Sequence, residues 1–458
     1  MTIVADVPGR FARRSKRIPQ ERLPGLRDDD LQALRGEATL RPGQLRAGLE
    51  AARSGRSRAE AQAPPVAVAA PPKPLITWAE IAEFVREARK TRLDRHLFFA
   101  VFSAVTAGIV FVFSASFPRA GRPVFAGGKE DPYSFLRQQA VFAVIGLVLM
   151  LVTSYLRPAM IRRAAGVALL FFMGLMAVCV FLAKHNGAAA WLGERGQPSE
   201  FGKLAYLLYI ATLIAGGADW VRNRQQLKTV GLTMAAMFIL LYLQNDLGMA
   251  MLIVGITFGL LFLRGTQGWL LASVGAGLIT LLSLGVTFGG SHFAHVRGRV
   301  EAWLHPEEHL SGPGGHIVNM LATTTRGGLV GEGLGMCGDK WKSLFAPHTD
   351  AIFCVIAGEL GLWGAAALVL LLCLIPFHCF RIAAGTKDDY AWLLAAGIGA
   401  SLGLQTLINV AVATNSIPCT GLTLPFISAG GSSLVASMVS IGVVLSVARW
   451  SRPQPEGR

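Results

Sequence analysis

The chain has 458 residues, with 43 Lys and Arg against 28 Asp and Glu, and a mean hydropathy of +0.48. Apolar residues make up 52% and charged residues only 16%, a composition that excludes an ordinary soluble domain and indicates an integral membrane protein. Six cysteines over this length, most of them in apolar runs, also exclude a disulfide-stapled secreted scaffold.

Basic residues are concentrated at the N-terminus. The first 95 residues hold 19 Lys and Arg, 12 Asp and Glu, and no long apolar segment. We predict that residues 1–76 form a disordered cytoplasmic arm, rich in Arg and then in Ala and Pro, because large apolar residues are too few to offset the entropy of ordering. The arm lacks the pattern of a secretory signal peptide and the aromatic residues that accompany nucleic-acid binding. We therefore expect it to contact anionic lipids or a cytosolic protein, and no nucleic acid.

A short amphipathic helix is expected between the arm and the bilayer. The segment Thr77-Trp78-Ala79-Glu80 fits a capping box. Ile81, Phe84 and Val85 then fall on one helical face. Residues 77–95 are thus predicted to form an interfacial helix.

Ten apolar runs of membrane-spanning length follow. We expect an all-α integral membrane protein with ten transmembrane helices in a domain covering residues 96–449. The expected spans are 97–116, 140–156, 165–182, 201–216, 230–243, 248–263, 269–288, 352–377, 392–412 and 434–447. Only Gln244-Asn245-Asp246-Leu247 separates the fifth span from the sixth. A tight hairpin is expected there, because one long helix would place Asp246 in hydrocarbon.

Lys and Arg on alternate connections set the expected orientation. With the N-terminal arm inside, every inner connection is basic. These residues are Arg157, Arg162 and Arg163; Arg222, Arg224 and Lys228; Arg264; Arg381 and Lys387; and Arg449, Arg452 and Arg458. Both termini are therefore expected in the cytoplasm, with a tail at 450–458. The long connection 291–348, between the seventh and eighth helices, is expected to form an outer loop.

Polar residues gather in the outer connections, whereas a pore or carrier would hold them near the bilayer midplane. The clusters are Gln197-Pro198-Ser199-Glu200 with Lys203; Arg297, Arg299, Glu301 and His305-Pro306; His348-Thr349-Asp350; and Ser428, Ser432 and Ser433 around Gly430-Gly431. The sequence therefore predicts that the chemistry lies at the outer surface.

Residues 417–433, IPCTGLTLPFISAGGSS, resemble the C-terminal signature of the shape, elongation, division and sporulation (SEDS) family, the membrane glycosyltransferases that polymerise bacterial cell-wall precursor. The resemblance covers about 97–449 and extends, in the family's order, to further motifs. These are Gln197-Pro198-Ser199-Glu200 with Lys203, Asp246-Leu247-Gly248, Arg299 with Pro306, Gly327-Gly328-Leu329 with Gly331, Gly333 and Gly335, residues 348–353 (HTDAIF), Glu359-Leu360-Gly361, and Asn409. Residues 420–425 are more similar to the FtsW-like division branch than to the RodA-like branch.

The chain departs from the family pattern at several positions. The family usually has Tyr where this chain has Ala429, Glu where it has Gly358, and Pro where it has Asn245. The family also has an Arg near 189 or 190, where this chain has Ala, and a Gln pair where His316 and Asn319 stand.

The resemblance implies that Asp350 is the essential acid. Polymerisation requires the 4-hydroxyl of one disaccharide to attack the anomeric carbon of another while undecaprenyl pyrophosphate leaves, and a general base assists such a step. A carboxylate beside apolar Ala351 and Ile352 would have its pKa raised toward a useful range. The alternative is that Thr349 and Asp350 cap the eighth helix, since both residue types suit that position.

Cationic loop residues are candidates for binding the pyrophosphate. Arg297 and Arg299 could make bidentate contacts, and Lys340 or Lys342 could act as point charges. The alternative is that these side chains face solvent or lipid headgroups.

Other polar residues also have two interpretations. Glu200 and Lys203, three apart on a helix, either contact substrate or pair with each other. The remaining candidates for substrate binding are His348, Thr349, Ser432 and Ser433. Gln405, Asn409 and Glu359 are interpreted as structural polar residues that form hydrogen bonds between helices. We recognise no metal-ligand set.

The prediction is a multi-pass protein of the bacterial inner membrane that polymerises lipid II into glycan strands at the outer face during cell division. The resemblance implies these partners: lipid II, a class B penicillin-binding transpeptidase, other division or elongation proteins, and membrane lipids. No redox or nucleotide cofactor is expected, and the resemblance allows a divalent cation, Mg or Mn. Two alternatives are a lipid II flippase, in which Glu359, Gln405 and Asn409 would line a path, and a non-catalytic division scaffold.

Overall fold

The computed structural model describes residues 94–120, 131, 133–186, 196–216, 223–288, 294–310, 313–342, 344 and 346–451. All of these belong to one compact unit, residues 79–458. This part of the chain forms helices and no β-sheet, so the all-α prediction is confirmed. The predicted arm (1–76), nearly all of the predicted interfacial helix (77–95) and residues 452–458 of the predicted tail lie outside the described residues.

A helix lies at each of the ten segments that were expected to span the membrane. These helices are α4 (Arg95–Ala120), α5 (Ser134–Tyr155), α6 (Pro158–Asn186), α7 (Pro198–Ile214), α8 (Arg224–Leu243), α9 (Leu247–Leu263), α10 (Gly268–Phe288), α14 (Ile352–Ala384), α15 (Asp389–Ala413) and α16 (Gly431–Trp450). Within the described residues, seven are long and apolar enough to cross a membrane: α4, α5, α6, α8, α14, α15 and α16. The number of ten crossings and the side of each terminus stay predictions.

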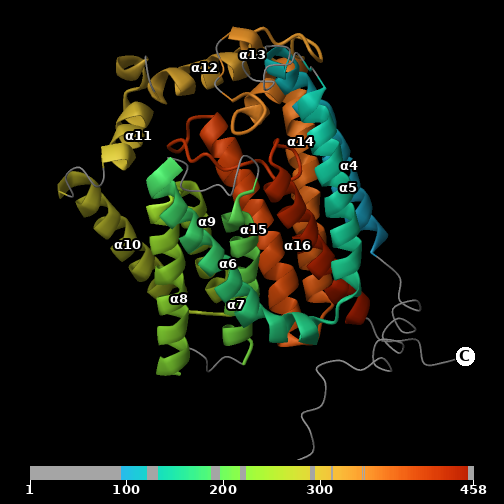
Figure 1. Ribbon diagram of the computed structural model, residues 1–458, viewed down its shortest axis with the longest axis vertical. Coiled ribbons are helices and arrows are strands. Elements are labelled where there is room, and N and C mark those ends of the chain that lie inside the picture. Colours follow the sequence, from blue (N-terminus) through green and yellow to red (C-terminus); the bar gives the residue numbers. More distant parts are fainter. Residues whose placement is uncertain are drawn as a thin grey trace, which may run out of the picture. The chain divides into compact units, whose positions relative to one another are not determined.

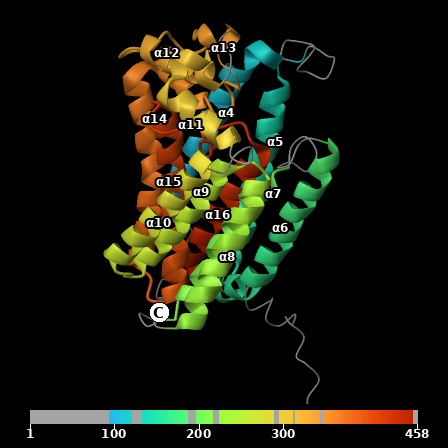
Figure 2. The same cartoon turned by 90° about the vertical axis from the view of Figure 1, so that its left-hand side faces the viewer.

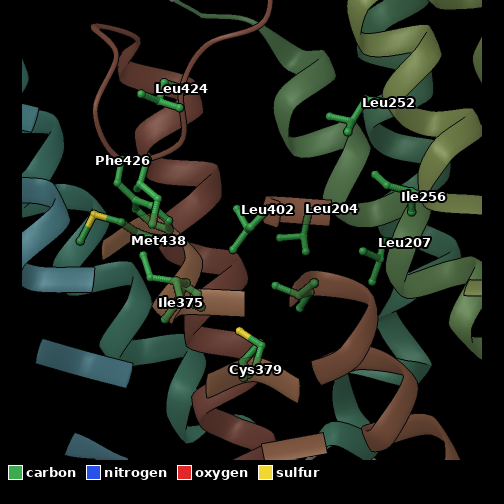
Figure 3. Close-up of a cluster of buried hydrophobic side chains, with 14 of the residues drawn as sticks. Leu204, Leu207, Leu252, Ile256, Ile375, Cys379, Leu402, Leu424, Phe426 and Met438 are labelled. Atoms are coloured by element: carbon green, nitrogen blue, oxygen red, sulfur yellow. The ribbon is translucent and has the colours of Figure 1, made fainter. Parts of the chain in front are cut away.

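The helices form a bundle in which α16 packs against α5 and α15 (Figures 1 and 2). Helix α16 is almost entirely buried and α15 largely so, whereas α5, α6 and α8 are mostly exposed. Many of their exposed side chains are large and apolar, as at Val167, Leu170 and Leu232. In the core, Leu204 of α7 lies beside Leu402 of α15, and Met438 of α16 lies near Phe426 (Figure 3). An apolar outer surface around a packed interior is what a lipid solvent requires.

The segment 291–348 is not simply a loop, as the sequence had suggested. Its described part contains α11 (Ala294–Leu304), η3 (Pro306–His309), α12 (Pro313–Arg326) and α13 (Asp339–Lys342). These helices lie together at one end of the bundle (Figure 1). Helix α12 forms because Ile317, Met320 and Thr323 recur every three residues and bury one face, and α12 packs on α14. The interpretation as a loop overlooked this short amphipathic period.

Helix α14 starts at Ile352, as expected, but it is broken at Gly361, whose φ is 67° and ψ −168°. The glycine-rich segment 327–335 fills the break. The amides of Glu332 and Gly333 donate to the carbonyls of Gly358 and Glu359, both at 2.9 Å, and the amide of Leu362 donates to the carbonyl of Gly328 at 2.9 Å. A Cβ at Gly361 would collide with backbone nitrogens of this segment. The backbone groups freed by the break are thus satisfied by protein.

A buried ion pair joins α13 to the same part of α14. The Lys340 Nζ lies 2.6 Å from Oε1 of Glu359. The Ser114 hydroxyl of α4 also donates to that oxygen, at 2.6 Å, and accepts from Lys340 at 3.0 Å. Both charged side chains are almost inaccessible to solvent. Lys340 is therefore not placed to bind a phosphate as a free surface cation.

We expect Glu359→Gln to lower stability strongly, because it leaves the Lys340 ammonium buried without its counter-ion. Breaking such a pair typically costs about 3–5 kcal/mol. The double variant Glu359→Leu/Lys340→Met should recover most of this loss. The check is the thermal unfolding midpoint of the purified protein in detergent.

The matched control is Asp389→Asn, which breaks the pair between Arg264 and Asp389 (2.7 Å), where the Asp389 side chain is 53% exposed. Exposed pairs contribute about 0–1 kcal/mol, so the midpoint should hardly change. If Glu359→Gln and Asp389→Asn lowered the unfolding midpoint equally, burial would not make the Lys340–Glu359 pair more important for stability than an exposed pair.

Candidate active site

Asp350 lies in the turn that precedes α14. The N-cap of α14 is Ala351, and no side chain caps the helix. The alternative that Thr349 or Asp350 is the helix cap is therefore wrong. The carboxylate of Asp350 is not used to hold the helix end and is available for chemistry.

Gly421 faces this carboxylate and belongs to the signature segment, residues 417–433. A Cβ built on Gly421 would lie 3.7 Å from Oδ2 of Asp350, and the φ of Gly421 is 73°. A side chain would be strained in this conformation and would stand against the carboxylate. The glycine thus leaves one side of Asp350 open.

Burial raises the pKa of Asp350 to about 6. The positive charge of Arg299 opposes this rise, and the negative charge of Asp246 adds to it. The carboxyl group therefore titrates just below neutral pH. It is largely ionised at pH 7 and more basic than an ordinary aspartate, as a general base requires.

Asp246 is a second, half-buried acid in this neighbourhood, and it was not predicted from the sequence as a site residue. It caps α9, accepting from the amide of Met249 at 3.0 Å, and its other oxygen accepts from Nε2 of Gln197 at 2.9 Å. Burial raises the pKa of Asp246 too, and the charge of Glu200 adds to the rise. The sequence feature that could have identified Asp246 as a site residue is its place in a very short turn between two apolar runs.

The two candidate arginines of α11 are placed differently. Arg299 is close enough to Asp350 and Asp246 for its charge to lower the pKa of both. Arg297 instead donates to the carbonyl of Thr287, near the end of α10, at 3.3 Å. The indole nitrogen of Trp303 donates to the carbonyl of Asn415 at 3.0 Å, which ties α11 to the turn just before the signature segment. Arg299 is thus the arginine that belongs to the site.

His348 and Thr349 bind the signature segment through their backbone. The amide of Ala429 donates to the carbonyl of His348 at 2.8 Å, and the hydroxyl of Ser428 donates to the carbonyl of Thr349 at 2.8 Å. The His348 ring packs on Phe135 with centroids 4.6 Å apart. These contacts fix the turn that carries Asp350, and a role of these two side chains in substrate binding stays a prediction.

Amide side chains of α15 hold the next part of the signature segment. Gln405 donates to the carbonyl of Thr423 at 2.9 Å, and Asn409 donates to the carbonyl of Leu422 at 2.8 Å. The Thr423 hydroxyl in turn shares a hydrogen bond of 2.7 Å with Ser433. Asn409 therefore connects α15 to an irregular segment, and Gln405 connects α15 both to that segment and, through Lys203, to helix α7.

Glu200 and Lys203 pair with each other. Their charged atoms are 2.8 Å apart, and the side chains are only 2% and 7% exposed. Lys203 also donates to Oε1 of Gln405 at 2.8 Å. The hydroxyl of Ser432 accepts from the amide of Gln197 at 3.3 Å. Direct contact of these residues, and of Ser433, with substrate stays a prediction.

Two departures from the family pattern fit their surroundings here. A Cβ at Gly358 would lie 3.1 Å from the sulfur of Cys337 and 3.3 Å from Thr323, so a long side chain has no room there. Ala429 contributes a backbone hydrogen bond to His348, which any residue but proline can make.

Among the described residues, no group of three or more His, Cys, Asp and Glu side chains is arranged to hold a metal ion. Mg²⁺ is nevertheless often bound by one or two carboxylates together with substrate phosphates. The carboxylates of Asp246 and Asp350 fit that mode. A divalent cation stays a prediction.

Comparison with known proteins identifies the family. The FtsW/RodA/SpoVE family, described as cell cycle protein, matches residues 95–453. A probable peptidoglycan glycosyltransferase FtsW from Trichlorobacter lovleyi is 33% identical, over 80% of this chain and 96% of that protein. Stage V sporulation protein E of Bacillus subtilis is 32% identical, over 80% and 99% of the two chains. The corresponding FtsW of Caulobacter vibrioides is 35% identical, over 80% and 91%.

Two solved structures are also similar. One is a chain of a peptidoglycan synthase complex that coordinates polymerization and crosslinking. It aligns with a TM-score of 0.65 and 28% identity, over 78% of this chain and 98% of that one. Thermus thermophilus RodA, a rod shape determining protein, aligns with a TM-score of 0.56 and 27% identity, over 79% and 98%. This chain therefore belongs to the FtsW/RodA/SpoVE family of cell cycle proteins.

Proposed function

We propose that this protein is a peptidoglycan glycosyltransferase that polymerises lipid II at the outer face of the bacterial inner membrane. The observation that carries the proposal is the carboxylate of Asp350, which is half-buried, is not used as a helix cap, and has a pKa raised to about 6. Family membership and the names of the relatives support the activity.

In the proposed reaction, Asp350 takes the proton from the acceptor's 4-hydroxyl. The hydroxyl oxygen forms a bond to the anomeric carbon of the donor, and the bond from that carbon to undecaprenyl pyrophosphate breaks. General-base assistance typically contributes about 10²–10⁴ in rate. The remainder must come from positioning two lipid-linked substrates and from stabilising charge.

Arg299 is the proposed cation for the leaving pyrophosphate. Its guanidinium can contact two phosphate oxygens at once, and it already acts electrostatically on the two acids of the site. A bound Mg or Mn ion would supply further positive charge there. Asp246 is proposed to tune the pKa of Asp350 rather than to react.

A transpeptidase of the class B penicillin-binding type is the proposed partner. One similar solved chain comes from a complex that both polymerises and crosslinks. A role in cell division is proposed because the signature segment resembles the division branch and several relatives are named FtsW.

The lipid II flippase alternative required polar side chains to line a path through the bundle. Gln405 and Asn409 are instead bonded to backbone carbonyls, and Glu359 to Lys340 and Ser114. These contacts favour the glycosyltransferase over the flippase. A scaffold would not need a half-buried acid with a raised pKa.

We expect purified protein with its transpeptidase partner to convert labelled lipid II into glycan chains in detergent, where no sidedness exists. Asp350→Asn and Asp350→Ala should lower the rate at least about 100-fold, because the general base is lost. Gel separation of the labelled products measures the rate. A flippase or a scaffold would make no glycan chains even without the substitution.

The matched control is Glu307→Gln in η3, an exposed carboxylate on the same side of the bundle. It should keep wild-type activity. Activity that survives in both Asp350 variants, with an unchanged unfolding midpoint, would refute the assignment of the base.

The pH profile should respond in opposite directions to two substitutions. In the wild type, activity should fall below about pH 6, where Asp350 becomes protonated. Arg299→Gln removes the charge that lowers the pKa of Asp350, so the acid limb should move to higher pH. Asp246→Asn removes the charge that raises this pKa and keeps the cap of α9, so the limb should move to lower pH.

The measured quantity is the pH at which activity falls to half of each variant's own maximum. This pH does not depend on the lower maximal rate that is expected for Arg299→Gln. Limbs that move in the same direction, or do not move, would contradict the electrostatic coupling between these three residues.

Sidedness is testable with two introduced cysteines. Glu307→Cys and Arg163→Cys are made after Cys373 and Cys419, the two native cysteines that are not buried, are changed to Ala. A membrane-impermeant maleimide should label position 307 in intact cells and position 163 only after the inner membrane is disrupted. The reverse pattern would place Asp350 away from its substrate.

A further inference from the structure

A cavity of about 590 Å³ lies at the end of the bundle opposite Asp350. Asp350 precedes the start of α14, whereas this cavity is lined by residues that follow the end of α14. The lining comes from the α5–α6 corner and the start of α6, from the α14–α15 turn, and from the end of α16. The members that carry a charge or an aromatic ring are Arg162, Lys387, Asp388, Tyr390 and Trp450.

A second cavity, of about 240 Å³, adjoins the first and shares Gly385 and Ser451 with it. Its lining adds Arg381, Thr386 and Asp94. Together the two cavities bring cationic and hydroxyl side chains from four helices to one place. Their volumes suit a small ligand or the head of a larger one.

The acidic side chains of this lining are already engaged. Asp388 caps α15, accepting from the amide of Ala391 at 2.7 Å. Asp94 accepts from the amide of Leu97 at 3.2 Å and pairs with Arg381 at 3.4 Å. Arg162 and Lys387 form no ion pair with another described residue, and both are exposed. Over the two cavities the lining carries Arg162, Lys387 and Arg381 against Asp388 and Asp94, which leaves a net charge of +1.

Near the same two cavities, three arginine guanidiniums lie over aromatic rings. The guanidinium of Arg162 lies over the ring of Tyr390, 5.4 Å from its centroid. The guanidinium of Arg157 lies over Trp450 at 4.9 Å, and that of Arg449 over Tyr155 at 4.0 Å. Tyr155 and Trp450 are the last residues of α5 and α16. Tyr and Trp at helix ends, with Arg beside them, mark the level of lipid headgroups.

We propose that this cavity binds the phosphate headgroup of an anionic phospholipid, with Arg162 and Lys387 as its charged contacts. An anionic ligand fits because the net charge of the lining is positive, and Arg162 and Lys387 form no ion pair with another described residue. A lipid is the source because the aromatic residues place the cavity at the membrane interface, where basic pockets between helices take anionic headgroups. The site does not depend on the proposed reaction.

The test uses the full chain in detergent, titrated with phosphatidylglycerol and followed by native mass spectrometry. The wild type should retain the lipid, and Arg162→Gln/Lys387→Gln should bind it about 30-fold more weakly, since each basic residue near a headgroup contributes about fivefold. The matched control is Arg163→Gln/Lys228→Gln, which removes two exposed cations that line neither cavity. The control should bind as the wild type does.

Two further arms identify the ligand. Phosphatidylcholine, which carries no net charge, should bind weakly to all three proteins, and inorganic phosphate should not displace phosphatidylglycerol. Equal loss in both double variants, equal binding of the two lipids, or displacement by inorganic phosphate would overturn the proposal. Equal unfolding midpoints of the two double variants would confirm that the comparison is made between folded proteins.

Discussion

The structure depends on satisfying the backbone of one irregular segment that lies inside a helical membrane domain. Peptide groups outside helices have no partner in hydrocarbon, and each one left unpaired costs several kcal/mol. Residues 414–430 avoid this penalty by bonding to the side chains of Gln405 and Asn409, and to the turn before α14. Gly248 on α9 lets the segment approach closely, since a Cβ there would collide with the carbonyl of Thr420. The position of Asp350 follows from these bonds.

The same bonds explain how buried charge is tolerated around the site. Glu200 and Lys203 neutralise each other, and the spare hydrogen-bonding capacity of Lys203 is used on Gln405, which in turn holds Thr423. The charge pair and the signature segment thus form one connected network, in which a defect at one member leaves others unsatisfied. Asp350 stands outside that network. It is the acid whose negative charge is opposed by a single nearby arginine rather than by a close ion pair.

The sequence predicted the helices well because a lipid-facing helix is encoded directly by a run of apolar residues, and each of the ten expected runs contains a helix. It predicted Asp350 only through resemblance, since one aspartate before an apolar run also suits a helix cap. The pair of Lys340 with Glu359 was not foreseen, because the residues are 19 apart and meet only when the segment 327–335 folds onto α14. Asp246 was missed as a site residue for the same reason: its neighbours Gln197, Arg299 and Asp350 come from distant parts of the chain. Local patterns report elements, and charge neighbourhoods arise from their assembly.

The break at Gly361 changes which part of α14 is available to cross the bilayer. After the break, the helix runs from 362 to 384, about 35 Å at 1.5 Å per residue, and this length already matches the hydrophobic thickness of a membrane, about 30 Å. The nine residues from Ile352 to Leu360 are therefore surplus to the crossing. Under the proposed function, this extra length of helix holds Asp350 beyond the acyl chains, where the sugar of a lipid-linked substrate would meet water.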